Sequence, residues 1–288
     1  MKRILFPTDF SEAANNALNI AIHLAKQVDA EIFVLHSLNS AQQYVDISLS
    51  TAGDLTMPGM QPEVVLAAME EEKKRVSGKM DEQIETLKGQ KVKVSHQIVQ
   101  QGLEHVLNEI TESEKIDFIV MGTHGSSGLR EAFIGTNAQK IVRIANIPVL
   151  TVNEKCDDFT IKKIVYCSDF TESQINEQLP RVKKFAEIFD AKLEMVYINT
   201  PTYFEETKTV NQRMREVMEQ YNLPNVGINI YNAFDIDEGV IDFAKEQDAN
   251  VISIITHGYR GVKKLFSDNI TESVVNHSEI PVLTLHIH

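Results

Sequence analysis

Short apolar runs alternate with longer segments of helical periodicity along the whole chain of 288 residues. In the first half, the apolar runs predict strands at 3–6, 31–36, 92–99, 117–121 and 148–152. Between these strands, apolar positions recur at helical spacing and predict helices at 12–27, 63–88, 103–112 and 138–145. Ser11 stands directly before the first of these helices and is a candidate N-cap. Strand–helix alternation of this kind predicts an α/β fold, with a parallel sheet and helices on both faces.

The pattern occurs twice. The stretch KRILFPTDFSE at 2–12 returns 160 positions later as KKIVYCSDFTE, and IPVLT at 147–151 returns 133 positions later. Each copy is as large as an ordinary domain, and two copies are too few for a solenoid. We therefore predict two tandem domains, 1–153 and 161–288, joined by a polar stretch. The first copy is longer mainly because of 39–61 and the helix that follows.

Composition and charge narrow the classes of function. The net charge of -13 argues against a nucleic-acid surface, which needs clustered Lys and Arg. Cys156 and Cys167 form no CxxC pair, which favours a reduced compartment. No apolar stretch approaches the roughly 18 residues of a membrane span, and no signal-peptide core precedes the first strand. We expect a cytoplasmic protein without nucleic-acid or membrane partners.

A glycine-rich stretch at 121–137 joins a predicted strand to a predicted helix. It reads MGTHGSSGLREAFIGTN, with glycines at Gly122, Gly125, Gly128 and Gly135. A glycine at the end of a strand lets the backbone turn and lets a ligand approach closely. The helix that opens at Gly135-Thr136-Asn137 offers free N–H groups and a positive dipole to a phosphate. From the glycines alone, a connection whose glycines serve only turns is an equally good interpretation.

The spacing of this stretch adds a resemblance. Gly122-x2-Gly125-x9-Gly135-Thr136, with His124 before the second glycine, resembles the nucleotide-binding motif of the universal stress protein family in its ATP-binding branch. The opening ILFPTDFS at 4–11 resembles the first strand and turn of that family. Because the pattern occurs twice, the resemblance covers nearly the whole chain. It implies two tandem Rossmann-like domains, each a five-stranded parallel sheet of order 3-2-1-4-5.

The resemblance also implies a site between strands one and four, where the strand order reverses. The residues that would border adenine and ribose are Pro7, Thr8, Asp9 and Ser37. Those that would lie along the ribose and the phosphates are Met121, Gly122, His124 and Gly125. Those that would hold the outer phosphates are Gly135, Thr136 and Asn137. The implied ligand is ATP, with Mg²⁺ or Mn²⁺ bound through oxygens of the nucleotide and water.

Several of these residues have a second interpretation. Asp9 also suits an Asx turn or a cap on the first helix, and this is compatible with binding ribose. His124 recurs in the second copy as His257, which favours a backbone-bonded loop histidine over a general base. No catalytic residue is assigned, since no Walker lysine or arginine finger is found, so slow ATP hydrolysis is the most we expect. His286 and His288 alternate along the last strand, and we assign no metal ligands.

The second copy departs from the motif. Ile255 replaces Gly122, Asp268 replaces Gly135, and Cys167 replaces Pro7. A carboxylate at a helix N-terminus is a good cap but repels a phosphate. We therefore predict that the second copy does not bind ATP by this mode.

The last strand of each copy, at 148–152 and 281–286, is expected at the edge of its sheet. Unpaired edges invite pairing, and in the family these strands pair across a two-fold axis. We expect an intramolecular pseudo-dimer, and a homodimer of whole chains stays open.

Two functions are compatible with these motifs. One is an ATP-dependent stress-response or signalling module, for which 39–61 is either a lid or a disordered loop. The other is a small-ligand or protein-interaction scaffold in which neither copy binds ATP.

Overall fold

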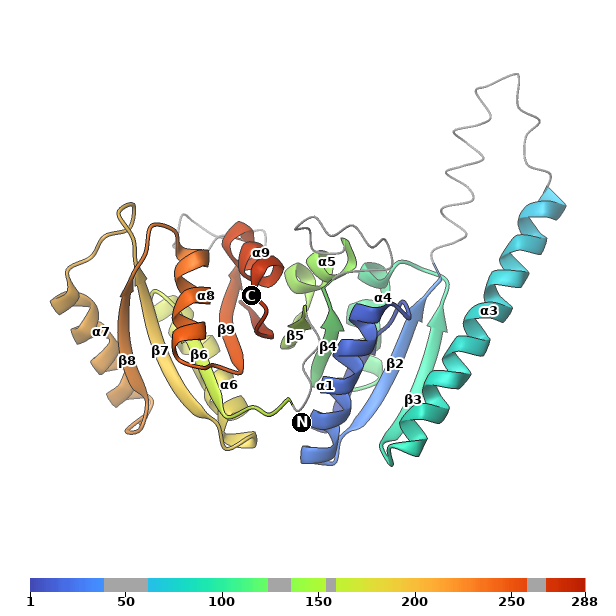
Figure 1. Cartoon of the computed structure of the whole chain (residues 1–288), viewed down its shortest axis with the longest axis horizontal. Helices are drawn as coiled ribbons and strands as arrows, with labels where there is room; N and C mark the ends of the chain where they lie inside the picture. Colours follow the sequence, from blue (N-terminus) through green and yellow to red (C-terminus); the bar gives the residue numbers. More distant parts are fainter. Residues whose placement is uncertain (39–61, 124–135, 154–158, 258–267, 288) are drawn as a thin grey trace, which may run out of the picture.

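A computed structural model describes residues 1–38, 62–123, 136–153, 159–257 and 268–287. The strands form one sheet of ten in the order β3-β2-β1-β4-β5-β10-β9-β6-β7-β8 (Figure 1). The first half contains β1 (Arg3–Pro7), α1 (Glu12–Val28), β2 (Glu31–Ser37), α3 (Pro62–Gly89), β3 (Lys93–Val99), α4 (Leu103–Ser113), β4 (Phe118–Gly122), α5 (Thr136–Ile144) and β5 (Val149–Val152). The second half contains β6 (Lys163–Cys167), α6 (Glu172–Ile188), β7 (Lys192–Asn199), α7 (Thr207–Gln220), β8 (Gly227–Asn232), α8 (Ile236–Glu246), β9 (Val251–His257), α9 (Asp268–His277) and β10 (Val282–Ile287).

Each half is a parallel sheet whose order, in its own numbering, is 3-2-1-4-5, as predicted. The pairing register repeats as well. Ile4 lies opposite Phe118 in the first half, and the residues that the sequence repeat aligns with them, Ile164 and Val251, lie opposite each other in the second. The two copies therefore share both topology and register.

The two halves meet at their fifth strands. β5 and β10 pair antiparallel, with Leu150 opposite Leu283. Thr151 Oγ1 donates to the Val282 carbonyl at 3.2 Å, and Thr284 Oγ1 donates to the Val149 carbonyl at 3.3 Å. Pairing satisfies backbone groups that an edge strand would expose, which is why an open fifth strand invites it.

Helices cover both faces of the sheet. Because side chains alternate along a strand, Ile4 and Phe6 belong to the core on the face covered by α1, α3, α6 and α7. Leu5 belongs to the core on the opposite face, which α4, α5, α8 and α9 cover. The apolar stripe of α1 is buried from Ala14 to Ala25, and Ser11 Oγ caps the helix by accepting a hydrogen bond from Ala14 N at 3.2 Å. The sequence predicted this cap. Each half thus has a core on either side of its sheet.

The predicted element boundaries agree with the structure to within a few residues. α5 begins at Thr136, two residues before the periodic stretch, so Thr136 and Asn137 stand in its first turn. The segment 39–61, read as a lid or a disordered loop, lies outside the described residues. Among the described helices, none is long and apolar enough to cross a membrane.

Candidate functional site

The carboxyl ends of β1 and β4 lie side by side. β1 ends at Pro7 and β4 at Gly122, and the two strands are parallel neighbours. β2 lies on the outer side of β1 and β5 on the outer side of β4, so the strand order reverses between them. At such a reversal, the two crossover connections leave on opposite faces and open a crevice. The structure thus brings together Pro7, Thr8, Asp9, Met121 and Gly122.

The turn after β1 is held by its own side chains. Thr8 is buried, its backbone N–H donates to the Leu35 carbonyl at 2.9 Å, and its Oγ1 accepts from Phe10 N at 3.0 Å. Asp9 Oδ1 accepts from Ser11 N at 2.9 Å, which is the Asx turn considered for this residue. Phe10 has a φ of 61°, a conformation that a phenylalanine rarely adopts. The Asp9 side chain remains exposed in this turn.

Gly122 has a packing role in addition to the one that the motif suggests. A Cβ at this position would lie 2.7 Å from both the backbone carbon and the carbonyl oxygen of Ala13, in the first turn of α1. The glycine is required because a helix backbone approaches the end of β4. The predicted place of Gly122 along the ribose and the phosphates of a nucleotide stays a prediction.

The end of β2 forms a second wall beside the turn. Ser37 Oγ donates to the Gln101 carbonyl at 2.6 Å. Its neighbour His36 is buried, with Nδ1 2.7 Å from the Thr8 carbonyl and a ring stacked on Phe10 at 4.8 Å between centroids. Burial lowers the pKa of His36, so the ring is neutral at pH 7 and donates its Nδ1–H to that carbonyl. The Lys79 ammonium from α3 lies 5.6 Å from the centre of the Phe10 ring.

Sequence reasoning missed His36, although a histidine inside an apolar strand is a recognisable signal. It also missed Thr123, which follows β4 and is buried. Thr123 Oγ1 donates to Asn153 Oδ1 at 2.7 Å, and Asn153 Nδ2 donates to the carbonyls of Asn276 and Ser278 at 2.8 and 3.2 Å. A hydrogen-bonded path therefore runs from the end of β4 into the second half of the chain.

The first turn of α5 supplies the remaining described candidates. Thr136 is the first residue of the helix, and the side chain of Asn137 is exposed. His124, Gly125 and Gly135 lie outside the described residues. The geometry of the phosphate-binding part of the motif is therefore a prediction from the sequence.

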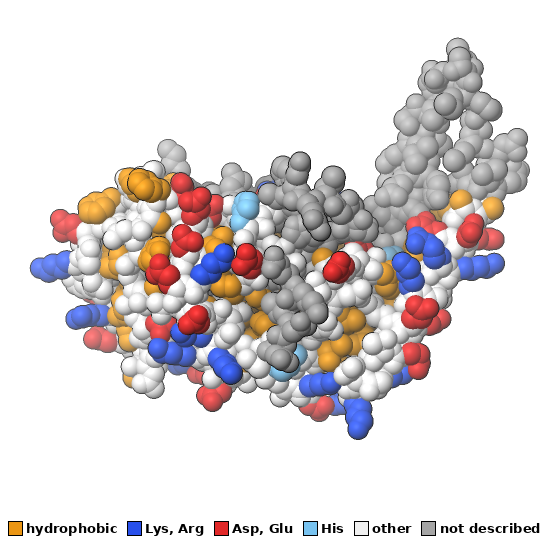
Figure 2. Space-filling model, in the orientation of Figure 1, with side chains coloured by type: hydrophobic (Ala, Val, Ile, Leu, Met, Phe, Trp, Pro, Cys, Tyr) orange, Lys and Arg blue, Asp and Glu red, His pale blue; other side chains and the backbone are white. Residues whose placement is uncertain are grey.

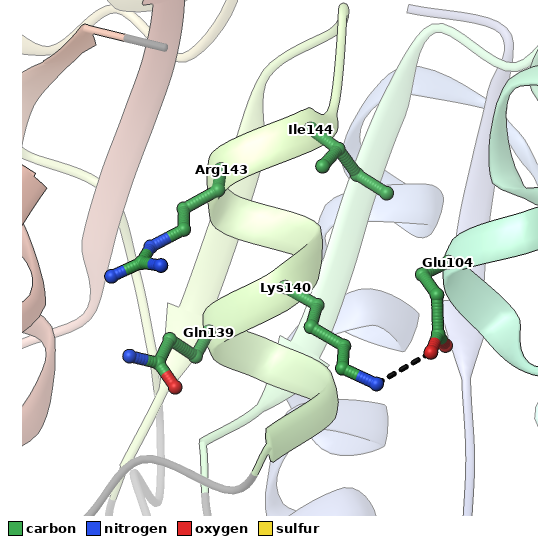
Figure 3. A pocket seen from close by; sticks show the side chains of 5 residues that line it. All are labelled: Glu104, Gln139, Lys140, Arg143 and Ile144. Atoms are coloured by element: carbon green, nitrogen blue, oxygen red, sulfur yellow. Dashed lines mark hydrogen bonds and ion pairs between the residues drawn. The ribbon is translucent and has the colours of Figure 1, made fainter. Parts of the chain in front are cut away.

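A cavity of about 230 Å³ lies between α4 and α5, and Figure 3 shows its lining. It is lined by Glu104, Gln139, Lys140, Arg143 and Ile144, none of which belongs to the predicted site. Lys140 Nζ lies 2.5 Å from Glu104 Oε1, and this hydrogen bond lowers the pKa of Glu104. Arg143 and Gln139 point to the opposite side of α5, where both bind the Glu272 carboxylate of α9.

The second half repeats the turn but buries it. Phe170 N donates to Ser168 Oγ at 3.0 Å, Thr171 N donates to Asp169 Oδ1 at 2.9 Å, and Phe170 has a φ of 56°. Asp169, the counterpart of the exposed Asp9, is only 3% exposed. Cys167 is also buried, and burial raises the pKa of its thiol, so it is not a reactive cysteine.

The other candidates in the second half are only partly described. His257 ends β9, Asp268 begins α9 and His286 lies in β10, but the structure describes only the backbone at these three positions. Cys156 and His288 lie outside the described residues. Within the described part of the chain, no cluster of three His, Cys, Asp or Glu side chains could hold a metal ion.

Comparison with known proteins gives a consistent result. The sequence model of the Universal stress protein family matches residues 1–153 and 233–286. Universal stress protein Slr1230 of Synechocystis sp. is 23% identical over 308 residues, which cover 99% of each chain. Universal stress protein MJ0577 of Methanocaldococcus jannaschii is 30% identical over 160 residues, 54% of this chain and 96% of the relative.

A solved universal stress protein from Archaeoglobus fulgidus has the same fold, with a TM-score of 0.68. It is 19% identical, and the match covers 99% of this chain and 98% of the other. The family match spans well over half of the chain and includes β1 and β4, whose ends border the candidate crevice. The repeated turn, the sheet order and these matches agree, and the chain belongs to the universal stress protein family.

Proposed function

We propose that the first half of the chain binds ATP at the carboxyl ends of β1 and β4, and that nucleotide occupancy controls a stress-response or signalling interaction. The observation that carries the proposal is the exposed Asp9 carboxylate at the point where the strand order reverses. An ionised carboxylate there can accept hydrogen bonds from the ribose hydroxyls. α5 starts at Thr136 after the strand next to β1, so its N-terminal N–H groups open toward the same edge of the sheet.

The other candidates have defined parts in this proposal. Pro7, Thr8 and the end of β2 at Ser37 border the adenine, and Met121, Gly122, His124 and Gly125 follow the ribose and inner phosphates. Gly135, Thr136 and Asn137 receive the outer phosphates. Mg²⁺ or Mn²⁺ is bound mainly by phosphate and water oxygens, as is usual for these ions at nucleotide sites.

The second half does not bind ATP in this proposal. Asp169 is buried where Asp9 is exposed, and Ile255 stands at the strand position that Gly122 holds in the first half. Domains 1–153 and 161–288 instead act together as an intramolecular pseudo-dimer in the cytoplasm. The antiparallel pairing of β5 with β10 supports this part of the proposal.

Isothermal titration of the full chain with Mg-ATP tests the proposal. We expect one site per chain, lost in Gly135→Asp, which gives the first copy the residue of the second. Asp9→Asn removes a charged acceptor and should weaken binding roughly 10- to 100-fold, since such hydrogen bonds contribute about 1.5–3 kcal/mol. The matched variant Asp169→Asn should leave the affinity unchanged. Two equivalent sites per chain, or no binding at all, would contradict the proposal. Absence of binding would favour the alternative of a small-ligand or protein-interaction scaffold.

A further inference from the structure

Three large aromatic side chains are exposed beyond the carboxyl ends of β7 and β8, in the second half of the sheet. Tyr203 is 45% exposed, Phe204 69% and Phe234 85%. In the described part of the chain, the one other large apolar side chain of comparable exposure is Leu66 on α3. Isolated apolar side chains are common on protein surfaces, but clustered aromatic ones mark interaction sites. We call Tyr203, Phe204 and Phe234 the aromatic patch.

The two loops that carry the aromatic patch are tied to the same residue. Asn199 ends β7, and its carbonyl accepts from Ala233 N at 3.1 Å, directly before Phe234. The Asn199 side chain accepts from Glu205 N at 3.1 Å, directly after Phe204. The two loops that carry the aromatic residues therefore lie side by side. Figure 2 shows hydrophobic side chains gathered at the upper left of the molecule, above the ends of β7 and β8.

The loop after β7, which carries Tyr203 and Phe204 and is the first of the two loops, is held by hydrogen bonds from β7 and α7. Tyr197 Oη lies 3.0 Å from both the Tyr203 carbonyl and the Glu205 carboxylate. Arg213 of α7 binds Glu205 through both terminal nitrogens, each at 2.9 Å, and its guanidinium lies 5.7 Å from the centre of the Tyr197 ring. The hydrogen bonds from Arg213 lower the pKa of Glu205, which keeps the pair charged. A preorganised loop loses less conformational entropy when a partner binds.

The charge around the aromatic patch is mainly negative. Asp235 and Glu238 are exposed at the start of α8, directly after Phe234, and Glu206 is exposed directly after the first loop. Lys208, two residues after Glu206, is an exposed positive charge in the same segment. The whole chain carries a net charge of -13. A second copy would bring like charges together at this surface, whereas a positively charged partner would be attracted.

We propose that the aromatic patch docks a cationic amphipathic segment of a partner protein. Its apolar side chains would pack on Phe204 and Phe234, and its Lys and Arg side chains would face Glu206, Asp235 and Glu238. The inference rests on the second half of the chain and does not require ATP binding by the first. The family match leaves out 154–232, the segment that carries Tyr203 and Phe204.

Fluorescence anisotropy with the full chain tests the proposal. The probe is a labelled helical peptide of about 18 residues, long enough for five turns, with leucines on one face and lysines on the other. We expect it to bind, and the double variant Phe204→Ser/Phe234→Ser to raise its Kd at least about tenfold, as for central aromatic contacts. Leu66→Ser, an equally exposed apolar side chain elsewhere, should leave the Kd unchanged. Asp235→Lys/Glu238→Lys should also weaken binding.

Four results would overturn the proposal. The peptide could fail to bind, or bind the double variant as tightly as the parent chain, which would mean general attraction to a negative protein. A matched leucine–glutamate peptide could bind equally well. Sedimentation could show a dimer that the double variant dissociates, which would make a second copy the occupant. Because the replaced side chains are exposed, far-UV circular dichroism should show an unchanged fold in every variant.

Discussion

The sequence repeat aligns Tyr166 of the second half with Phe6 of the first. It likewise aligns Ser253 of the second half with Val120 of the first. Tyr166 and Ser253 lie opposite each other in the register of β6 and β9, and both are completely buried. Among the described residues, neither hydroxyl has a hydrogen-bond partner of ordinary geometry, although Ser168 lies beside Tyr166. Burial raises the pKa of Tyr166, so its hydroxyl stays protonated. An unsatisfied buried hydroxyl is costly to the folded state.

Tyr166→Phe should therefore stabilise the protein by about 1 kcal/mol, because it removes the unpaired hydroxyl and keeps the ring. Tyr197→Phe is the matched comparison. It removes a hydroxyl bonded to Tyr203 and Glu205, and should lower the free energy of unfolding by about 1–2 kcal/mol. Urea denaturation measures both. If Tyr166→Phe destabilised the protein, the hydroxyl would have a partner, such as a buried water.

At the scale of elements, the close approach of α1 to β4 fixes the edge where the predicted site lies. The approach is closest at Gly122, where the backbone of Ala13 leaves no room for a Cβ. In a closely packed interior, an added methyl group moves the backbone or strains neighbouring side chains. The turn that carries Asp9 leads directly into α1, so a shift of α1 would also move the turn.

Gly122→Ala should lower the free energy of unfolding by about 1–3 kcal/mol, the usual cost of overpacking. Gly78→Ala is the control, since a Cβ at this position of α3 meets nothing within 4 Å. The control should stabilise the protein by up to about 1 kcal/mol through helix propensity. Thermal denaturation of both variants checks the difference. A Gly122→Ala variant of normal stability would mean that the glycine is not required by packing.

At the scale of the whole molecule, side chains reinforce the strand pairing between the halves. Glu272 of α9 accepts from Gln139 Nε2 at 2.6 Å and forms an ion pair with Arg143, both on α5. Glu272 is mostly buried, so the pair is less screened than an exposed one. Since α5 begins at the predicted phosphate site, this contact also joins that site to the second half.

Glu272→Ala should lower the free energy of unfolding by about 1–3 kcal/mol, because it removes the carboxylate that binds Arg143 and Gln139 across the junction. Glu279→Ala is the control, since Glu279 and its partner Lys245 are both well exposed and 3.5 Å apart. The control should change stability by less than about 0.5 kcal/mol. Urea unfolding followed by circular dichroism gives both values. Equal effects would show that the buried contact does not stabilise the junction.

Much of the fold could be predicted from the residues in order. The sheet order within each half and the cap at Ser11 were predicted correctly, and the two fifth strands pair with each other. The packing constraint on Gly122 was not predicted, because it comes from the backbone of Ala13, far away in the sequence. His36, Thr123 and the loop at Tyr203 were missed because their partners also lie on other elements. The motif itself lies partly outside the described residues.

The sequence by itself determined the α/β class, the duplication and the position of the candidate motif. These properties depend on local periodicity and on the order of residue types, which a chain carries before it folds. Only the tertiary structure decided that Asp9 is exposed and Asp169 buried, although both stand in the same short turn. The physical reason is that exposure depends on which distant segments pack against a residue. Two copies of one motif can therefore differ: the first has an exposed turn at a candidate nucleotide site, and the second has a buried turn.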